Sequence, residues 1–347
     1  MLFASVLCSA SLLSPQAVCD NTSTGIVPLN DLGSGLYLGQ FEGGLYPGGS
    51  NDAPAAHALE GNTRGAALRP LDVFGNPDLH GRVVVVSIGM STTTQEFCSS
   101  TSFPPCEPWS FMGQALGNPG VDPRVVLVNG AFTEQVTEDW ESPTDPNYDR
   151  IRDVWLNPAG MSELQVQVAW VKLINAFPSI SLPSLQADAY ALFLGLTNVV
   201  RALKTRYPNM QQVFFSSRHY GGYVFGPSNP EPFAFETGFS VKWLIEAQIA
   251  QMAGGGVNPV LGDLGYDGAA PWLAWGPYLW ADGLTPRSDG LIWECSDYES
   301  DGLHPSPTGE AKVADRLLDF LLASPFSEPW FARHHGGRIE RSPFRLR

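Results

Sequence analysis

The stretch Arg82-Val83-Val84-Val85-Val86-Ser87-Ile88-Gly89-Met90-Ser91 is a short run of β-branched residues that ends in a glycine and a serine. A continuous apolar run of this length is typical of a strand that is buried on both faces of a sheet. Three similar runs follow along the chain, at residues 124–128, 165–171 and 212–216. The alternating glutamines of the run at residues 165–171 favour a less buried strand. The sequence therefore predicts four strands of one sheet.

Helical segments lie between and after these strands. We expect helices at residues 185–207, 239–252 and 307–322. Ser184 is a candidate cap for the first helix, and Ser306 with Pro307 is a typical start for the last one. Strands that alternate with helices form a parallel sheet with helices on both faces. The predicted fold class is α/β, in three α/β/α layers around a central parallel sheet.

The remaining segments divide the chain further. Residues 1–17 contain an apolar run of signal-peptide length, although an ordinary buried N-terminal segment is the alternative. Residues 18–80 are rich in Gly, Pro and Asn, which predicts an irregular N-terminal wrap. Residues 81–325 hold the predicted strands and helices, and residues 326–347 are expected to be a C-terminal tail. One domain is preferred over two, because no clear linker interrupts the chain.

The excess of acidic residues makes negatively charged binding partners unfavourable. The 347 residues carry 20 Lys and Arg against 35 Asp and Glu, a formal net charge of −15. Nucleic acid and anionic membrane surfaces are unfavourable partners for such a chain. We also expect no membrane span, because no apolar run approaches 18 residues.

The cysteines indicate an oxidising compartment. Cys8 falls in the expected signal, which leaves four cysteines in the mature chain. Cys98 and Cys106 bracket a short loop, so we expect them to form a disulfide, and Cys19 with Cys295 is then the pairing by elimination. No CxxC motif supports metal binding as the alternative. We expect a secreted or periplasmic protein.

Three residues at the expected carboxyl end of the sheet suit nucleophilic acyl transfer. Ser91 follows the first strand, and Asp301 and His304 lie three residues apart just before the last helix. A serine needs a general base within hydrogen-bond reach, histidine can take its proton, and a carboxylate fixes the imidazole. A serine after a strand is by itself more often a turn or cap residue, and Asp-x-x-His a capped loop. Their combination predicts a catalytic triad.

These residues resemble the conserved blocks of the SGNH (GDSL-type) hydrolases. Gly89-Met90-Ser91 resembles the Gly-Asp-Ser block with Met90 in place of the aspartate, and Asp301-Gly302-Leu303-His304 matches the Asp-x-x-His block. The resemblance also implies a flavodoxin-like sheet and an oxyanion hole formed by Ser91, Gly130 and Asn175. Lys172 and Ala176 depart from the block around Asn175, whose alternative role is to hold a turn.

Substrate-binding residues are predicted from two further segments. Arg218 follows the fourth strand and is a candidate for the mouth of the site, with a solvated loop end as the alternative. Trp275 and Trp280 belong to an aromatic stretch at residues 271–280 that Gly276 and Pro277 interrupt. Aromatic rings on such a loop can stack on sugar rings, or they can pack the loop onto the core.

The sequence therefore predicts a serine esterase whose substrate is a small-molecule or polysaccharide ester, with an acylated carbohydrate favoured. No cofactor and no metal is expected. The alternative is a non-catalytic carbohydrate-binding protein on a decayed hydrolase scaffold, because the chain lacks some residues of the family blocks.

Overall fold

The computed structural model describes residues 16–334 apart from residues 100, 102 and 104. A parallel five-stranded sheet in the order β4-β3-β5-β6-β7 forms its centre. Its strands are β3 (Val83–Gly89), β4 (Val125–Val128), β5 (Val166–Lys172), β6 (Gln212–Phe215) and β7 (Trp272–Trp275). A separate antiparallel pair joins β1 (Leu36–Tyr37) to β2 (Phe41–Glu42). The strand order reverses between β3 and β5, and ligands bind at such a switch point in open parallel sheets.

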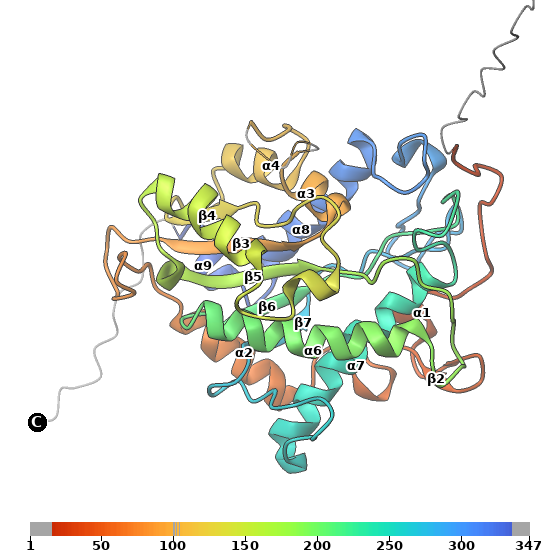
Figure 1. Ribbon diagram of the computed structural model, residues 1–347, viewed down its shortest axis with the longest axis horizontal. Coiled ribbons are helices and arrows are strands. Elements are labelled where there is room, and N and C mark those ends of the chain that lie inside the picture. Colours follow the sequence, from red (N-terminus) through yellow and green to blue (C-terminus); the bar gives the residue numbers. More distant parts are fainter. Residues whose placement is uncertain (1–15, 100, 102, 104, 335–347) are drawn as a thin grey trace, which may run out of the picture.

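Helices cover both faces of this sheet (Figure 1). α6 and α7 pack against each other on one face, while α3, α4 and α8 lie on the other (Figure 1). The described helices are α1 (Leu29–Leu32), α2 (Ala55–Ala67), α3 (Ser91–Phe97), α4 (Phe111–Gly117), α5 (Pro146–Arg150), α6 (Asp188–Arg206), α7 (Phe233–Ala250), α8 (Pro307–Ala323) and α9 (Glu328–Phe331). The predicted three-layer α/β/α fold is confirmed.

The sheet differs from the sequence-based expectation in two places. β5 is buried along its whole length, because the amides of Gln165 and Gln167 donate to the backbone carbonyls of Leu71 and Arg69. Satisfied polar groups can be buried at little cost, so the expectation of a less buried strand was wrong. The fifth strand, β7, lies in the aromatic stretch at residues 271–280, which was expected to be a loop.

The N-terminal segment is more regular than predicted. Residues 18–80 include α2, a helix of 13 residues. Gly61 and Gly65 lie one turn apart on this helix, and side chains there would overlap the Trp272 ring and the Phe326 carbonyl. The two glycines, which lower helix propensity, are thus the residues that let α2 approach the core.

The C-terminal segment is only partly a tail. Trp330 and Phe331 are buried, and the carbonyl of Phe331 accepts a hydrogen bond of 2.8 Å from the Asp122 N–H. Residues up to 332 therefore belong to the packed domain, since Ala332 also forms a backbone bridge with Val121. The predicted signal at residues 1–17 falls almost wholly outside the described residues, as does the end of the chain from residue 335.

Both predicted disulfides are present, Cys98–Cys106 and Cys19–Cys295. Beside the second bridge, the Ala17 N–H donates to the Ser300 carbonyl at 2.6 Å. The first described residues are thereby fastened to the segment that carries Asp301. Between residues 16 and 334, no described helix is long and apolar enough to cross a membrane.

We expect the two bridges to differ in their contribution to stability. They close loops with sequence separations of 276 and 8 residues. In the chain-entropy model, removing the long bridge as a Cys19→Ser/Cys295→Ser pair costs about 5.6 kcal/mol, and removing the short one costs about 2–3 kcal/mol. Urea denaturation of the two double variants measures the difference. Equal losses would contradict the entropic account, and free thiols in peptide maps would contradict the pairing.

Candidate active site

Ser91 is the first residue of α3, and one residue, Met90, separates it from the end of β3. Gly89, at the end of the strand, is paired with Lys172 of β5. A side chain at Gly89 would overlap the Lys172 carbonyl and the Thr93 side chain, so only glycine permits this close approach. The backbone N–H of Ser91 precedes the first helical hydrogen bond and has no backbone partner among the described residues. Ser91 thus presents both a hydroxyl and a free N–H.

Asp301 and His304 lie on one tight loop that the backbone closes on itself. The Glu299 N–H donates to the His304 carbonyl at 2.8 Å, while the Leu303 and His304 N–H groups donate to Asp301 Oδ1 at 2.8 and 3.0 Å. Gly302 has a φ of +69°, and a side chain there would overlap the Tyr223 carbonyl. The local sequence therefore turns Asp301 and His304 to the same side of the loop.

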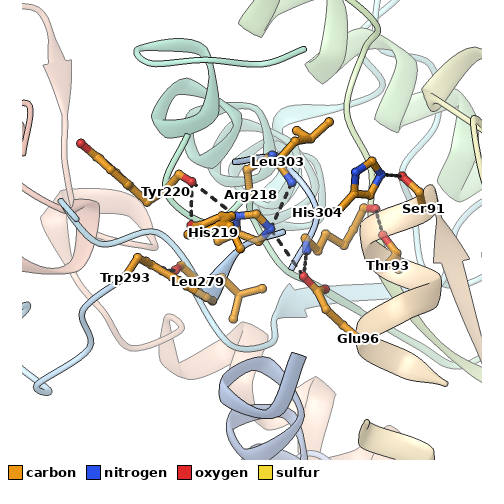
Figure 2. Close-up of polar contacts among 12 residues, drawn as sticks. Ser91, Thr93, Glu96, Arg218, His219, Tyr220, Leu279, Trp293, Leu303 and His304 are labelled. Carbon is orange, nitrogen blue, oxygen red and sulfur yellow. Dashed lines mark hydrogen bonds and ion pairs between the residues drawn. The ribbon is translucent and has the colours of Figure 1, made fainter. Parts of the chain in front are cut away.

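The structure brings the three predicted catalytic residues together, and Figure 2 shows the Ser91–His304 contact. His304 Nδ1–H donates to Asp301 Oδ2 at 2.6 Å, and Ser91 Oγ–H donates to His304 Nε2 at 2.9 Å. The side chains of His304 and Asp301 are 28% and 29% exposed, so solvent and substrate can reach them. Such a chain can transfer the serine proton to the imidazole while the carboxylate fixes the imidazole tautomer.

Asp301 is held in its ionised form. Partial burial by itself would raise the pKa of this carboxyl, but the hydrogen bonds from His304 and Leu303 outweigh it and lower the pKa to about 2. The carboxylate is therefore charged at any pH at which the imidazole could act as a base.

Gly130 and Asn175, the two other predicted oxyanion donors, differ in whether the predicted donor group already makes a hydrogen bond. The Gly130 N–H donates to the Val128 carbonyl at 2.9 Å, because the chain turns back at the end of β4. The Gly130 N–H is therefore already engaged with the backbone, and its assignment to the oxyanion hole stays a prediction. Asn175 is half-buried, and its side-chain carboxamide makes no hydrogen bond to a described residue. Its backbone carbonyl accepts a hydrogen bond of 3.0 Å from the side chain of Asn229.

The predicted substrate-binding residues are not on the surface. Arg218 is 1% exposed and its guanidinium donates to His219 Nε2 at 3.2 Å, so it lies beneath the site and not at its mouth. Trp275 and Trp280 are also buried, and their indole N–H groups donate to the Leu45 carbonyl and to Glu231, each at 2.7 Å. Neither indole can stack on a sugar, and the prediction of a binding role for these three residues was wrong.

Sequence reasoning missed a group of aromatic residues beside the carboxyl end of β3. The Phe132 N–H donates to the Gly89 carbonyl at 3.1 Å, which fixes Phe132 near the end of β3. Phe103, on the Cys98–Cys106 loop, makes an edge contact with Phe132 and stacks on Trp155 with ring centroids 5.9 Å apart. Phe103 is 39% exposed. These three residues are far apart in the sequence, so no local pattern predicts that their rings meet.

A second missed group is charged and buried. Lys172 and Glu96 form an ion pair with both side chains 0% exposed, and His219 lies against it (Figure 2). Lysine and glutamate are rarely buried unless paired, so the sequence alone points to neither. Within the described residues, no group of three or more His, Cys, Asp or Glu could hold a metal ion.

The ionisation of Asp301 predicts a pH-dependent contribution to stability. A folded pKa of about 2 lies below the unfolded value of about 3.9, so the contribution is full above pH 4 and is lost as the pH falls through 2. The difference in unfolding free energy between wild type and Asp301→Asn should therefore be smaller at pH 3 than at pH 6, as measured in urea. Glu299→Gln, an exposed carboxyl on the same loop, is the control. A difference that does not change with pH would contradict the assignment.

Comparison with known proteins found no matching family model and no matching curated protein. Among solved structures, the chain is similar to the protein YxiM of Bacillus subtilis, with 13% identity, a TM-score of 0.37, and coverage of 69% of this chain and 56% of the other. It is also similar to Est24, a carbohydrate acetylesterase from Sinorhizobium meliloti (14% identity, TM-score 0.36, 69% and 97% coverage). A third similar structure is a protein from Parabacteroides merdae that is described as a GDSL-like lipase. It has 12% identity and a TM-score of 0.34, with coverage of 68% of this chain and 94% of the other.

At these identities the assignment of an activity rests on the chain's own residues. Ser91 follows the first strand of the central sheet, and Asp301 and His304 precede its last long helix. The chain has the three-layer α/β/α architecture expected from its resemblance to the SGNH (GDSL-type) hydrolases.

Proposed function

We propose that this chain is a divergent SGNH hydrolase that cleaves carboxylic esters through Ser91, His304 and Asp301. The observation that carries the proposal is the imidazole of His304, which bridges Ser91 Oγ at 2.9 Å and Asp301 Oδ2 at 2.6 Å. A serine and an Asp-x-x-His loop that served only as caps would have no reason to meet across 213 residues of sequence.

The geometry supports a two-step reaction. Ser91 Oγ attacks the ester carbonyl carbon while its proton moves to His304 Nε2, and the imidazolium then gives this proton to the departing alcohol. A water molecule, deprotonated by the same imidazole, releases the acid from the acyl-enzyme. The Ser91 N–H is available for the developing oxyanion, and the carboxamide of Asn175 is the second donor that we propose.

Secretion is part of the proposal. Cys19–Cys295 and Cys98–Cys106 are both paired, and disulfides persist mainly in oxidising compartments. The N-terminal apolar run, typical of a signal peptide, supports the same destination.

Ser91→Ala should abolish ester hydrolysis, with a loss of at least about 10⁴-fold in kcat and an unchanged circular dichroism spectrum. The reason is that no other group of the triad can form the acyl-enzyme. A fluorophosphonate probe, followed by peptide mapping, should label Ser91 in the wild type and nothing in the variant. Ser288→Ala, on an exposed loop, is the control and should be labelled normally.

Absence of labelling in well-folded wild-type protein would favour the alternative, a carbohydrate-binding protein without activity. Wild-type turnover by Ser91→Ala would rule out the serine mechanism.

For the substrate we propose an acylated carbohydrate. The aromatic stretch at residues 271–280 no longer supports this, because Trp275 and Trp280 are buried. The proposal rests instead on the partly exposed group formed by Phe103, Phe132 and Trp155. This group lies beside the end of β3, and its flat rings can stack on a sugar.

Acetylated xylo-oligosaccharide should therefore be hydrolysed faster than a C10 nitrophenyl ester, measured as kcat/KM. Phe103→Ala should raise the KM for the oligosaccharide about tenfold, equal to about 1.4 kcal/mol of lost binding, with little change in kcat. Phe74→Ala, which removes another exposed phenylalanine, should leave KM unchanged. A tenfold preference for the C10 ester would contradict the carbohydrate proposal.

A further inference from the structure

Four charged or titratable side chains are buried together beneath the triad. Glu96, Lys172, Arg218 and His219, here called the buried cluster, are each at most 1% exposed. Lys172 forms an ion pair with Glu96, His219 Nε2 lies 3.7 Å from Glu96 Oε1, and Arg218 Nη1 lies 3.2 Å from His219 Nε2. The four side chains thus form a continuous chain of contacts. Figure 2 shows Glu96, His219 and Arg218 in this order.

One end of the buried cluster belongs to the element that carries the nucleophile. Glu96 is on α3, whose first residue is Ser91. Its partner Lys172 ends β5, and the Lys172 carbonyl also accepts a hydrogen bond of 2.8 Å from Thr93 Oγ1 of the same helix. The helix is therefore fastened to β5 at two points, by a side-chain ion pair and by a backbone carbonyl.

The other end reaches the loop that carries the base. The His219 ring makes an edge contact with the Tyr298 ring, with centroids 5.1 Å apart. Tyr298 forms a backbone bridge with Pro305, so these two residues close the loop that contains Asp301 and His304. The Tyr298 hydroxyl donates to the Tyr220 carbonyl at 2.7 Å, which holds this ring in place.

The charge states follow from this environment. Burial, with the neighbouring Arg218 and Lys172 charges, holds the pKa of His219 well below its usual range, so its imidazole is neutral. Arg218 then donates to Nε2, and Nδ1–H faces the Tyr220 carbonyl at 3.4 Å. The approach of His219 to Glu96 is therefore a packing contact, and among the described residues Lys172 is the cation that pairs with Glu96.

Stability does not account for such an arrangement. Glu96 Oε2 and Arg218 Nε and Nη2 are buried without a hydrogen-bond partner among the described residues. Buried ion pairs can often be replaced by apolar residues without loss of stability, and unpartnered polar atoms make the exchange more favourable. The buried cluster lies between α3, which carries Ser91, and the loop that carries Asp301 and His304. This placement points to a role other than stability.

We propose that the buried cluster is a positioning device that ties α3 to the base of the Asp301–His304 loop and thereby fixes the separation of Ser91 and His304. Its four members are positioning residues, since none of them touches Ser91 Oγ. The proposal rests on the function proposed above, because it explains how the triad is kept assembled.

The test replaces the ion pair by neutral groups of similar shape, Lys172→Met with Glu96→Gln. The matched control is Lys242→Met with Glu246→Gln, an ion pair of 3.1 Å on α7 in which the lysine is buried and the glutamate partly exposed. We expect both double variants to fold. The cluster variant should lose at least tenfold in kcat with KM within threefold, and Ser91 should react with the fluorophosphonate more slowly by the same factor. The control should match the wild type in all three measurements.

Amide hydrogen exchange provides a readout that needs no catalysis. In the cluster variant, exchange at α3 and at residues 298–305 should be at least tenfold faster, while the control is unchanged in both segments. If wild-type protein neither hydrolyses esters nor reacts with the probe, the proposed function fails, and the exchange data alone decide whether the cluster ties the two segments together.

A third variant guards against misfolding. His219→Phe keeps an aromatic ring between Glu96 and Tyr298 but cannot accept from Arg218, and it should lower kcat at least fivefold with KM unchanged. Wild-type kcat and wild-type exchange in a folded cluster variant would overturn the proposal, as would a loss confined to KM. If the cluster variant does not fold, wild-type kcat in His219→Phe would overturn it.

Discussion

The close approach of β3 and β5 at their carboxyl ends is the constraint on which the site depends. Gly89 pairs with Lys172, and any side chain at Gly89 would overlap the Lys172 carbonyl. Because Gly89 has no side chain, α3 can begin one residue beyond the strand and Thr93 can bond to that same carbonyl. Ser91 is therefore held by backbone geometry at the point where the strand order reverses.

The features that could be predicted from the sequence are those whose signal is local. Short runs of β-branched and aromatic residues identified β3 to β6, and the spacing of Asp301 and His304 within one loop identified the second half of the proposed triad. β7 and α2 could not be found in this way. The strand β7 is half tryptophan, and α2 contains Gly61 and Gly65, whose low helix propensity is outweighed by contacts with Trp272 and Phe326.

The orientation of side chains beyond the triad depends on partners far away in sequence. Lysine is ordinarily exposed, and Lys172 is buried only because Glu96, 76 residues earlier, neutralises it. The aromatic stretch gave no indication that the Trp280 indole would find the Glu231 carboxylate. Tertiary contacts of this kind decide whether a polar or aromatic residue faces the core or the substrate, and no periodicity of the chain reports them.

The disulfide between Cys19 and Cys295, with the Ala17–Ser300 hydrogen bond beside it, has a consequence for how the molecule is made. Contacts that are so distant in sequence form late, because the chain entropy of closing the loop must be overcome first. At a synthesis rate of about 5–20 residues per second, Cys19 is made about 15–55 seconds before its partner. The segment that fastens the Asp301 loop is thus synthesised well before that loop, yet it is among the last to find its place.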